Sequence, residues 1–236
     1  MASSSHPKID QRRGRLYMWL LLFQALSLFS NIVIIPASKS GDYFITPTIA
    51  AFIDLFCSLS LTTAALFFLY HFINKRWYFY LLASALTLST IVIFIVTIIG
   101  LEKNNFHEYR IILGCTTTVT LIMIFTSFYE AVTDVFGEKL KIRDALLGAT
   151  NIFLLIIILF TFIYAVIGIV VPNSVVADAD ISKLYNTCYI HSSYMVASLD
   201  LNENNLAPFV RNSMVIESLF AHLFEVMIIG RLLSKV

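Results

Sequence analysis

Acidic side chains inside apolar segments are the residues of this 236-residue chain that are best suited to do chemistry. Asp54, Glu217 and Glu225 each lie within a long run of apolar residues. A charged group inside a bilayer is costly, so such residues usually face a bundle interior or water and often mark ion pathways. For Asp54 the plainer alternative is a hydrogen bond to a hydroxyl of the same helix, such as Ser58 or Thr62.

The composition is that of a membrane protein. Hydrophobic residues make up 58% of the chain and charged residues 13%, against roughly 45–50% and about 25% in ordinary globular proteins. This balance excludes a disordered chain, a nucleic-acid-binding protein and most soluble enzymes. The formal net charge of +1 says nothing about partners, so the distribution of the charges is more informative.

Six apolar runs are predicted to cross the membrane as helices, because a hydrocarbon core about 30 Å thick requires about 20 helical residues. They are 16–37, 46–72, 77–101, 111–132, 146–171 and 212–233. With this arrangement, 11 of the 16 Lys and Arg residues fall on the side of the N-terminus. The positive-inside rule then predicts a multi-pass protein of the cell or plasma membrane with both termini in the cytoplasm.

The predicted spans divide the chain into four parts. A basic cytoplasmic N-terminus covers 1–15 and a four-helix domain covers 16–132. A cytoplasmic interfacial linker, 133–145, connects it to a C-terminal module, 146–236. The fourth predicted span contains no Lys or Arg, whereas a voltage sensor needs several gating charges. Conventional voltage gating is therefore not expected.

Between the last two predicted spans lies a segment that is too short to cross the membrane as a helix. Asp180 and Ser182 are good N-cap residues for a helix over 183–194. A short helix and a non-helical return are tolerated at membrane depth only where they are buried in protein or line water. Outer helix, re-entrant helix, extended return and inner helix are the parts of a tetrameric cation-channel pore.

The region 137–236 resembles the pore module of the potassium-channel superfamily. In many members the final helix has an Arg at its start, a Glu six residues later and a Gly four residues after that. Arg211, Glu217 and Ala221 stand at these positions, and Asp200 matches an Asp that follows the selectivity filter. The resemblance implies a fourfold assembly around a central cation pathway.

The filter departs from the family signature TVGYG. In register with Asp200, Ala197 and Leu199 stand where the family has Gly. Gly reaches positive φ freely, whereas Leu does so only at a cost. We therefore expect an atypical filter with poor selectivity for potassium. The predicted constriction consists of Met195, Val196, Ala197, Ser198, Leu199 and Asp200.

Acidic residues outnumber basic ones in the predicted outer segment, 172–211. In a fourfold assembly each acidic position becomes a ring that attracts cations. The predicted outer vestibule consists of Asp178, Asp180 and Glu203. For Asp178 and Asp180, a solvated acidic loop is the equally weighted alternative.

The final span places its acidic residues on one helical face at 100° per residue. That face consists of Glu217, Ala221, Glu225, Ile228 and Leu232. Glu217 is predicted to hydrogen-bond the filter from behind, and Glu225 to line the inner pore. Pairing of Glu225 with Arg231, or snorkelling to the interface, is the alternative. His222 is expected to be a packed, hydrogen-bonded histidine rather than a ligand.

Enzyme, metal and cofactor signatures are missing from the sequence. It contains no nucleotide-binding loop, no hydrolase motif, no CxxC and no His/Cys cluster at zinc-ligand spacing. We therefore expect no catalytic residues, no metal and no cofactor.

The prediction is an all-α integral membrane protein with six transmembrane helices and a re-entrant pore helix and loop. It would act as a homotetrameric, cation-permeable channel whose partners are the bilayer and permeant cations, without nucleic acid. Two alternatives remain. One is a non-conducting accessory subunit with a channel fold, plugged at Ala197 and Leu199. The other is a small secondary transporter with Asp54 and Glu217 as coupling sites.

Overall fold

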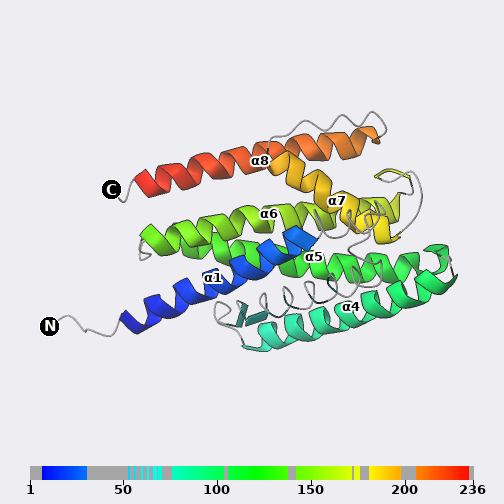
Figure 1. Ribbon diagram of the computed structural model, residues 1–236, viewed down its shortest axis with the longest axis horizontal. Coiled ribbons are helices and arrows are strands. Elements are labelled where there is room, and N and C mark those ends of the chain that lie inside the picture. Colours follow the sequence, from blue (N-terminus) through cyan, green and yellow to red (C-terminus); the bar gives the residue numbers. More distant parts are fainter. Residues whose placement is uncertain are drawn as a thin grey trace, which may run out of the picture.

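All elements in the described part of the chain are helices (Figure 1). The computed structural model describes residues 7–30, 76–103, 106–137, 142–171, 173–175, 181–197 and 206–233, with isolated positions between 53 and 70. The helices are α1 (Pro7–Phe29), α4 (Arg76–Lys103), α5 (Phe106–Phe136), α6 (Ile142–Val170), α7 (Ile181–Val196) and α8 (Pro208–Leu233).

Helix α6 lies in the middle of the bundle. It contacts α1, α5, α7 and α8, whereas α4 packs against α5. Figure 1 shows α5 and α8 running antiparallel to α6, with α8 along one edge of the molecule. A helix that is apolar on every side must be buried or face lipid. The nearly continuous apolar sequence of α6 therefore explains its central position.

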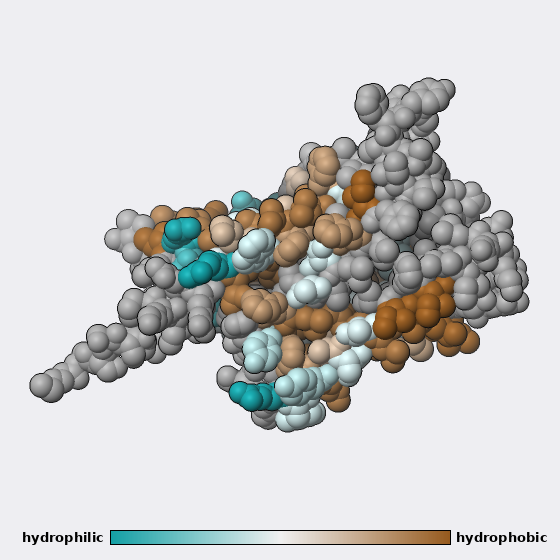
Figure 2. All heavy atoms as spheres, turned by 60° about the horizontal axis from the view of Figure 1, so that its bottom comes forward, coloured by the Kyte–Doolittle hydropathy of each residue, from teal (hydrophilic) through white to brown (hydrophobic). Residues whose placement is uncertain are grey.

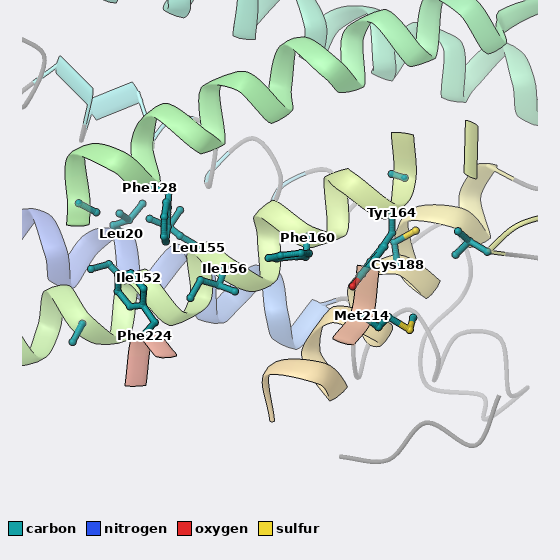
Figure 3. Close-up of a cluster of buried hydrophobic side chains, with 14 of the residues drawn as sticks. Leu20, Phe128, Ile152, Leu155, Ile156, Phe160, Tyr164, Cys188, Met214 and Phe224 are labelled. Atoms are coloured by element: carbon teal, nitrogen blue, oxygen red, sulfur yellow. The ribbon is translucent and has the colours of Figure 1, made fainter. Parts of the chain in front are cut away.

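The main hydrophobic core forms around α6 (Figure 3). Ile152 and Ile156 of α6 are fully buried. Phe128 of α5 meets Phe224 of α8 with 5.6 Å between ring centroids, a separation typical of aromatic pairs. The core thus brings α5 and α8 into contact beside α6.

Three helices in the described part are long and apolar enough to cross a membrane. They are Arg110–Phe136, Ile142–Val170 and Pro208–Arg231, which correspond to the predicted spans 111–132, 146–171 and 212–233 to within two residues at their C-terminal ends or extend beyond them. Figure 2 shows that apolar side chains form much of the described surface on one side of the molecule. Exposed apolar faces of this extent are typical of a surface that lipid or another protein covers.

Of the other three predicted spans, one lies wholly within a described helix and two are described only in part. Helix α4 covers 77–101 and α1 covers the first part of 16–37, but residues 31–52 and most of 53–72 lie outside the described part. Helix α1 also begins earlier than the predicted span, at Pro7, a residue favoured in the first turn of a helix. The protein is therefore all-helical where it is described and carries helices that can span a membrane.

The helices on either side of the predicted linker 133–145 are longer than expected. Helix α5 continues to Phe136 and α6 begins at Ile142, while 138–141 lie outside the described part. Helix α6 ends at Val170, as Pro172 predicts. Asn173 follows with a φ of 59°, a left-handed conformation that Asn adopts more readily than most residues.

Hydrogen bonds at one end of the bundle join four helices. The Tyr17 hydroxyl of α1 donates to Asp134 Oδ2 of α5 at 2.7 Å, and Asn151 Nδ2 of α6 donates to the Tyr17 carbonyl at 2.9 Å. Arg231 Nη2 of α8 donates to the Gly137 carbonyl at 2.9 Å. The first turns of α1 and the last turn of α8 therefore lie at the same end of the bundle.

Arg110 joins two helices at the opposite end. Its Nη2 donates to the Val170 carbonyl at 2.5 Å and its Nε donates to the Ile169 carbonyl. These carbonyls belong to the last turn of α6, where the helix offers no donors of its own. A cation at a helix C-terminus also complements the helix dipole. Arg110 thus caps α6 from the beginning of α5.

Candidate functional site

The candidate site is centred on a buried carboxylate. Glu217 of α8 has no exposed surface. Its Oε2 accepts a hydrogen bond from the Tyr164 hydroxyl of α6 at 2.5 Å, and its Oε1 accepts one from the Ser192 hydroxyl of α7. A buried carboxyl group is costly unless it is hydrogen-bonded. Each carboxylate oxygen thus has a donor from a different helix.

Ser192 makes this site a junction of three helices. Besides its contact with Glu217, its hydroxyl lies 2.9 Å from the Ile157 carbonyl of α6. One hydroxyl has a single proton and two acceptor lone pairs, so these two acceptors share that proton. We call Tyr164, Ser192 and Glu217 the α6–α7–α8 node. It holds the C-terminal half of α7 against both longer helices.

Small residues and core packing set the position of α7. A Cβ on Gly168 of α6 would lie 2.6 Å from Leu184 Cδ1, so α7 packs where α6 has no side chain. Cys188 is fully buried one turn further along α7. Figure 3 shows Tyr164 directed from α6 toward the region of Cys188 and Met214. Polar and apolar contacts therefore both fix α7 on α6.

Two tyrosines connect α7 to the rest of the bundle. The hydroxyls of Tyr185 and Thr117 of α5 are 2.6 Å apart. Tyr189 is hydrogen-bonded to Ser27 of α1. A buried Tyr usually finds a hydrogen-bond partner for its hydroxyl. Helix α7 is consequently attached to α1, α5, α6 and α8 by side-chain hydrogen bonds.

The predicted filter residues divide at the end of α7. Met195 and Val196 are the last two residues of the helix, half-buried against the core, and Ala197 is an exposed turn residue. An extended return that starts at Met195 is therefore incorrect, because apolar packing prolongs the helix by two residues. Ser198, Leu199 and Asp200 lie outside the described residues, as do the vestibule residues Asp178, Asp180 and Glu203.

The predicted acidic face of α8 is split by the packing. Glu217, Ala221 and Ile228 are buried, whereas Glu225 is exposed. His222 is also exposed, so the expectation that it is packed is wrong, although its ring is hydrogen-bonded as expected. The buried face is centred about 60° away from Glu225, at 100° per residue.

Sequence reasoning identified Glu217 but missed both of its donors. Tyr164 is 53 positions and Ser192 is 25 positions away in the chain. The available signal was their polarity, since hydroxyls in largely apolar membrane helices bond across helix contacts. Nothing in the linear spacing, however, pairs these hydroxyls with Glu217. Asp54, the third acidic candidate, lies outside the described residues.

The described residues of one chain do not form a metal centre. No three of their His, Cys, Asp or Glu side chains lie together in a way that would hold an ion. The node consists of two hydroxyls directed at one carboxylate, which is an arrangement for holding helices in place.

No protein-family model matches the chain, and no match is found among curated proteins or solved structures. The class that fold and site define is an all-helical protein with helices able to span a membrane, in which a short buried helix is held between two long ones.

Proposed function

We propose that this protein is a multi-pass membrane channel, in which α6, α7 and α8 form the pore module of a homotetrameric cation pathway. One observation carries the proposal. The 16-residue helix α7 is hydrogen-bonded through the α6–α7–α8 node between two helices that can cross a membrane. At 1.5 Å per residue it is about 24 Å long, less than a hydrocarbon core of about 30 Å.

The attachment of α7 supports a re-entrant pore helix. A short helix at membrane depth must be covered by protein or line water. Helix α7 contacts α6 and α8 and is hydrogen-bonded to α1 and α5. The C-terminal end of a helix carries a partial negative charge, which favours cations near it. The residues that follow α7, 197–200, would form the constriction.

The exposed face of α8 supports an assembly of several copies. Leu219, Leu223 and Val226 are more than 60% exposed in a single chain. Inner pore helices of a tetramer contact their neighbours in other subunits, so they are covered on one side only within a single chain. Position at the edge of the bundle agrees with this role (Figure 1).

The remaining topology follows from the sequence. Six spans with a cytoplasmic N-terminus place the shared end of α1 and α8 on the cytoplasmic side. Arg15, Arg143 and Arg231 would then lie toward the cytoplasm. The Gly positions of a potassium filter are filled by Ala197 and Leu199. The pathway we propose is therefore a cation pathway with weak potassium selectivity.

Two measurements on purified protein test the proposal. Native mass spectrometry from detergent should give a tetramer, and proteoliposomes should pass K⁺ and Na⁺ but exclude Cl⁻. Asp200→Asn should reduce cation conductance by about threefold or more, because a ring of charge raises the local cation concentration. Glu138→Gln is the matched control, since it removes one carboxylate on the predicted cytoplasmic side and should leave conductance nearly unchanged.

The outcomes separate the alternatives. A monomer would overturn the pore proposal and favour a transporter. A tetramer that passes no ion under any gradient would overturn conduction and favour an accessory subunit. Equal effects of Asp200→Asn and Glu138→Gln would overturn the placement of the constriction.

A further inference from the structure

The oxygen contacts around Glu217 need more protons than a carboxylate and its two donors contain. The Tyr164 hydroxyl lies 2.5 Å from Glu217 Oε2, and the Ser192 hydroxyl contacts both Glu217 Oε1 and, at 2.9 Å, the Ile157 carbonyl. Each of these three contacts is a hydrogen bond only if a proton lies between the two oxygens. A hydroxyl has one proton, whereas a carboxylate and a carbonyl have none. Tyr164 and Ser192 therefore supply two protons for three contacts.

A proton on Glu217 removes this shortage. The Tyr164 hydroxyl donates to Oε2, so the added proton belongs on Oε1. A protonated carboxyl group has one O–H donor and still accepts at its other oxygen. Oε1 then donates to Ser192 Oγ, and Ser192 donates to the Ile157 carbonyl. Each contact has a proton of its own, whereas a carboxylate would force two acceptors to share the single proton of Ser192.

The Ile157 carbonyl does not depend on Ser192 for a donor, but the contact between them still requires a proton. The Thr161 hydroxyl also donates to this carbonyl, at 2.7 Å. If Ser192 donated only to Glu217, however, oxygen lone pairs of Ser192 and Ile157 would face each other at 2.9 Å with no proton between them. The close approach of these two oxygens thus favours a Ser192 proton directed at Ile157 and a separate proton on Glu217.

Burial of the Glu217 side chain acts in the same direction. Glu217 has no exposed surface and belongs to the helix Pro208–Arg231, which is long and apolar enough to cross a membrane. A buried carboxyl group without a cationic partner is generally neutralised by a proton, because moving an unpaired charge out of water is costly. Within the described residues, Glu217 is hydrogen-bonded to two neutral hydroxyls and makes no ion pair. The neutral acid is therefore the form that this environment stabilises.

The titratable groups on the two helices that pack against α8 do not replace this proton. Helix α6 contributes Tyr164, which acts as a donor. Helix α7 contributes two buried groups, Cys188 in the region toward which Tyr164 is directed and His191 next to Ser192 in the chain (Figure 3). Both oxygens of Glu217 are bonded to hydroxyls rather than to either of these groups. The proton that completes the node therefore belongs to Glu217 itself.

We propose that Glu217 is a proton-binding site, which in the folded protein is a neutral carboxylic acid that donates to Ser192. The ligand is a proton taken from water. Its release would leave a buried carboxylate and one proton too few for the contacts that hold α7 against α6 and α8. The attachment of α7 is thus controlled by protonation. The site is complete within one chain and depends neither on a tetramer nor on conduction.

Infrared spectroscopy of the purified full-length protein in detergent tests the protonation directly. At neutral pH, the unmodified protein should show the C=O band of a protonated carboxyl group, and Glu217→Gln should lose this band. Glu225→Gln is the matched control, since it removes an exposed carboxyl group from the same helix and should keep the band. Absence of the band from the unmodified protein, or its persistence in Glu217→Gln, would overturn the proposal.

The pH dependence of stability gives a second readout. Exposed carboxyl groups are ionised at neutral pH, so a protonated Glu217 makes the folded state bind one proton more than the unfolded chain. As pH rises, the unfolding equilibrium constant should therefore increase by up to about tenfold per pH unit, until the folded state also loses the proton. Glu217→Gln should lack this contribution, because its NH₂ group can donate to Ser192 without titrating. Equal pH slopes for Glu217→Gln and the unmodified protein would contradict the proposal.

Discussion

The hydrogen bond between Tyr164 and Glu217 gives the sharpest quantitative prediction. Tyr164→Phe removes only the hydroxyl that donates to Glu217 Oε2 at 2.5 Å. Glu217→Leu removes both oxygens of the carboxyl group, so no acceptor remains at this position for the Tyr164 hydroxyl. A double-mutant cycle on these two positions therefore isolates the energy of this contact.

The expected coupling is about 1.5 kcal/mol. Hydrogen bonds to charged groups contribute about 1.5–3 kcal/mol in soluble proteins. Between membrane helices, measured couplings average about 0.6 and reach about 1.7 kcal/mol. Glu217 is fully buried and both of its oxygens are hydrogen-bonded, so this pair belongs at the upper end of the membrane range. A coupling of about 1.5 kcal/mol corresponds to roughly a tenfold change in the unfolding equilibrium constant.

Unfolding in mixed micelles, followed by far-ultraviolet circular dichroism as the denaturing detergent is increased, provides the assay. Tyr164→Phe alone should lower the free energy of unfolding by about 2 kcal/mol, because it leaves a buried carboxyl oxygen without its donor. Tyr129→Phe, which removes an exposed hydroxyl from α5, should change it by less than about 0.5 kcal/mol. Additivity of the two node mutations within about 0.5 kcal/mol would refute the reasoning.

Further predictions concern packing, the connection to α5 and the cap of α6. Gly148→Ala should lower the free energy of unfolding by about 1–3 kcal/mol, because its Cβ would lie 2.3 Å from Val135 Cγ2. A Cβ on Gly230 would meet nothing within 4 Å, so Gly230→Ala should leave the protein's stability unchanged or raise it by up to about 1 kcal/mol. Equal unfolding midpoints for the Gly148→Ala and Gly230→Ala variants would contradict this account. Tyr185→Phe should cost about 1 kcal/mol in the same assay and speed amide hydrogen exchange in α7; unchanged exchange would exclude an anchoring role. Arg110→Gln should lower the free energy of unfolding by about 1 kcal/mol. Arg110→Lys should not restore this stability, because one ammonium group does not reproduce the two hydrogen bonds that the guanidinium donates to the Ile169 and Val170 carbonyls.

Much of the helical framework was predictable from apolar run lengths. The predicted helix 183–194 corresponds to α7, Ile181–Val196, and the predicted spans 111–132, 146–171 and 212–233 correspond to α5, α6 and α8. These helices contain long stretches of residues that cannot expose their backbone to lipid, so helix is the only local solution for a spanning segment. Their ends were less predictable, because packing of Met195 and Val196 against the core extends α7.

The sequence did not predict the rotation of α8 about its own axis, which decides which of its residues are buried. At 100° per residue, Glu217 and Glu225 are only about 80° apart, and the pattern alone placed them on one face. Packing against α6 and α7 buries Glu217 and leaves Glu225 exposed together with His222. A helix with apolar residues all round has no strong preferred face, so neighbouring helices decide its rotation.

The sequence by itself determined that this is an apolar, helical chain with segments able to span a membrane, and that a few acidic residues inside them must have partners. Local hydrophobicity and backbone hydrogen bonding are sufficient for those conclusions. Only the tertiary structure decided that Glu217 is held by Tyr164 and Ser192, and that His222 and Glu225 are exposed on α8. Both depend on which helix faces meet, and this is set by side-chain packing between segments distant in the chain.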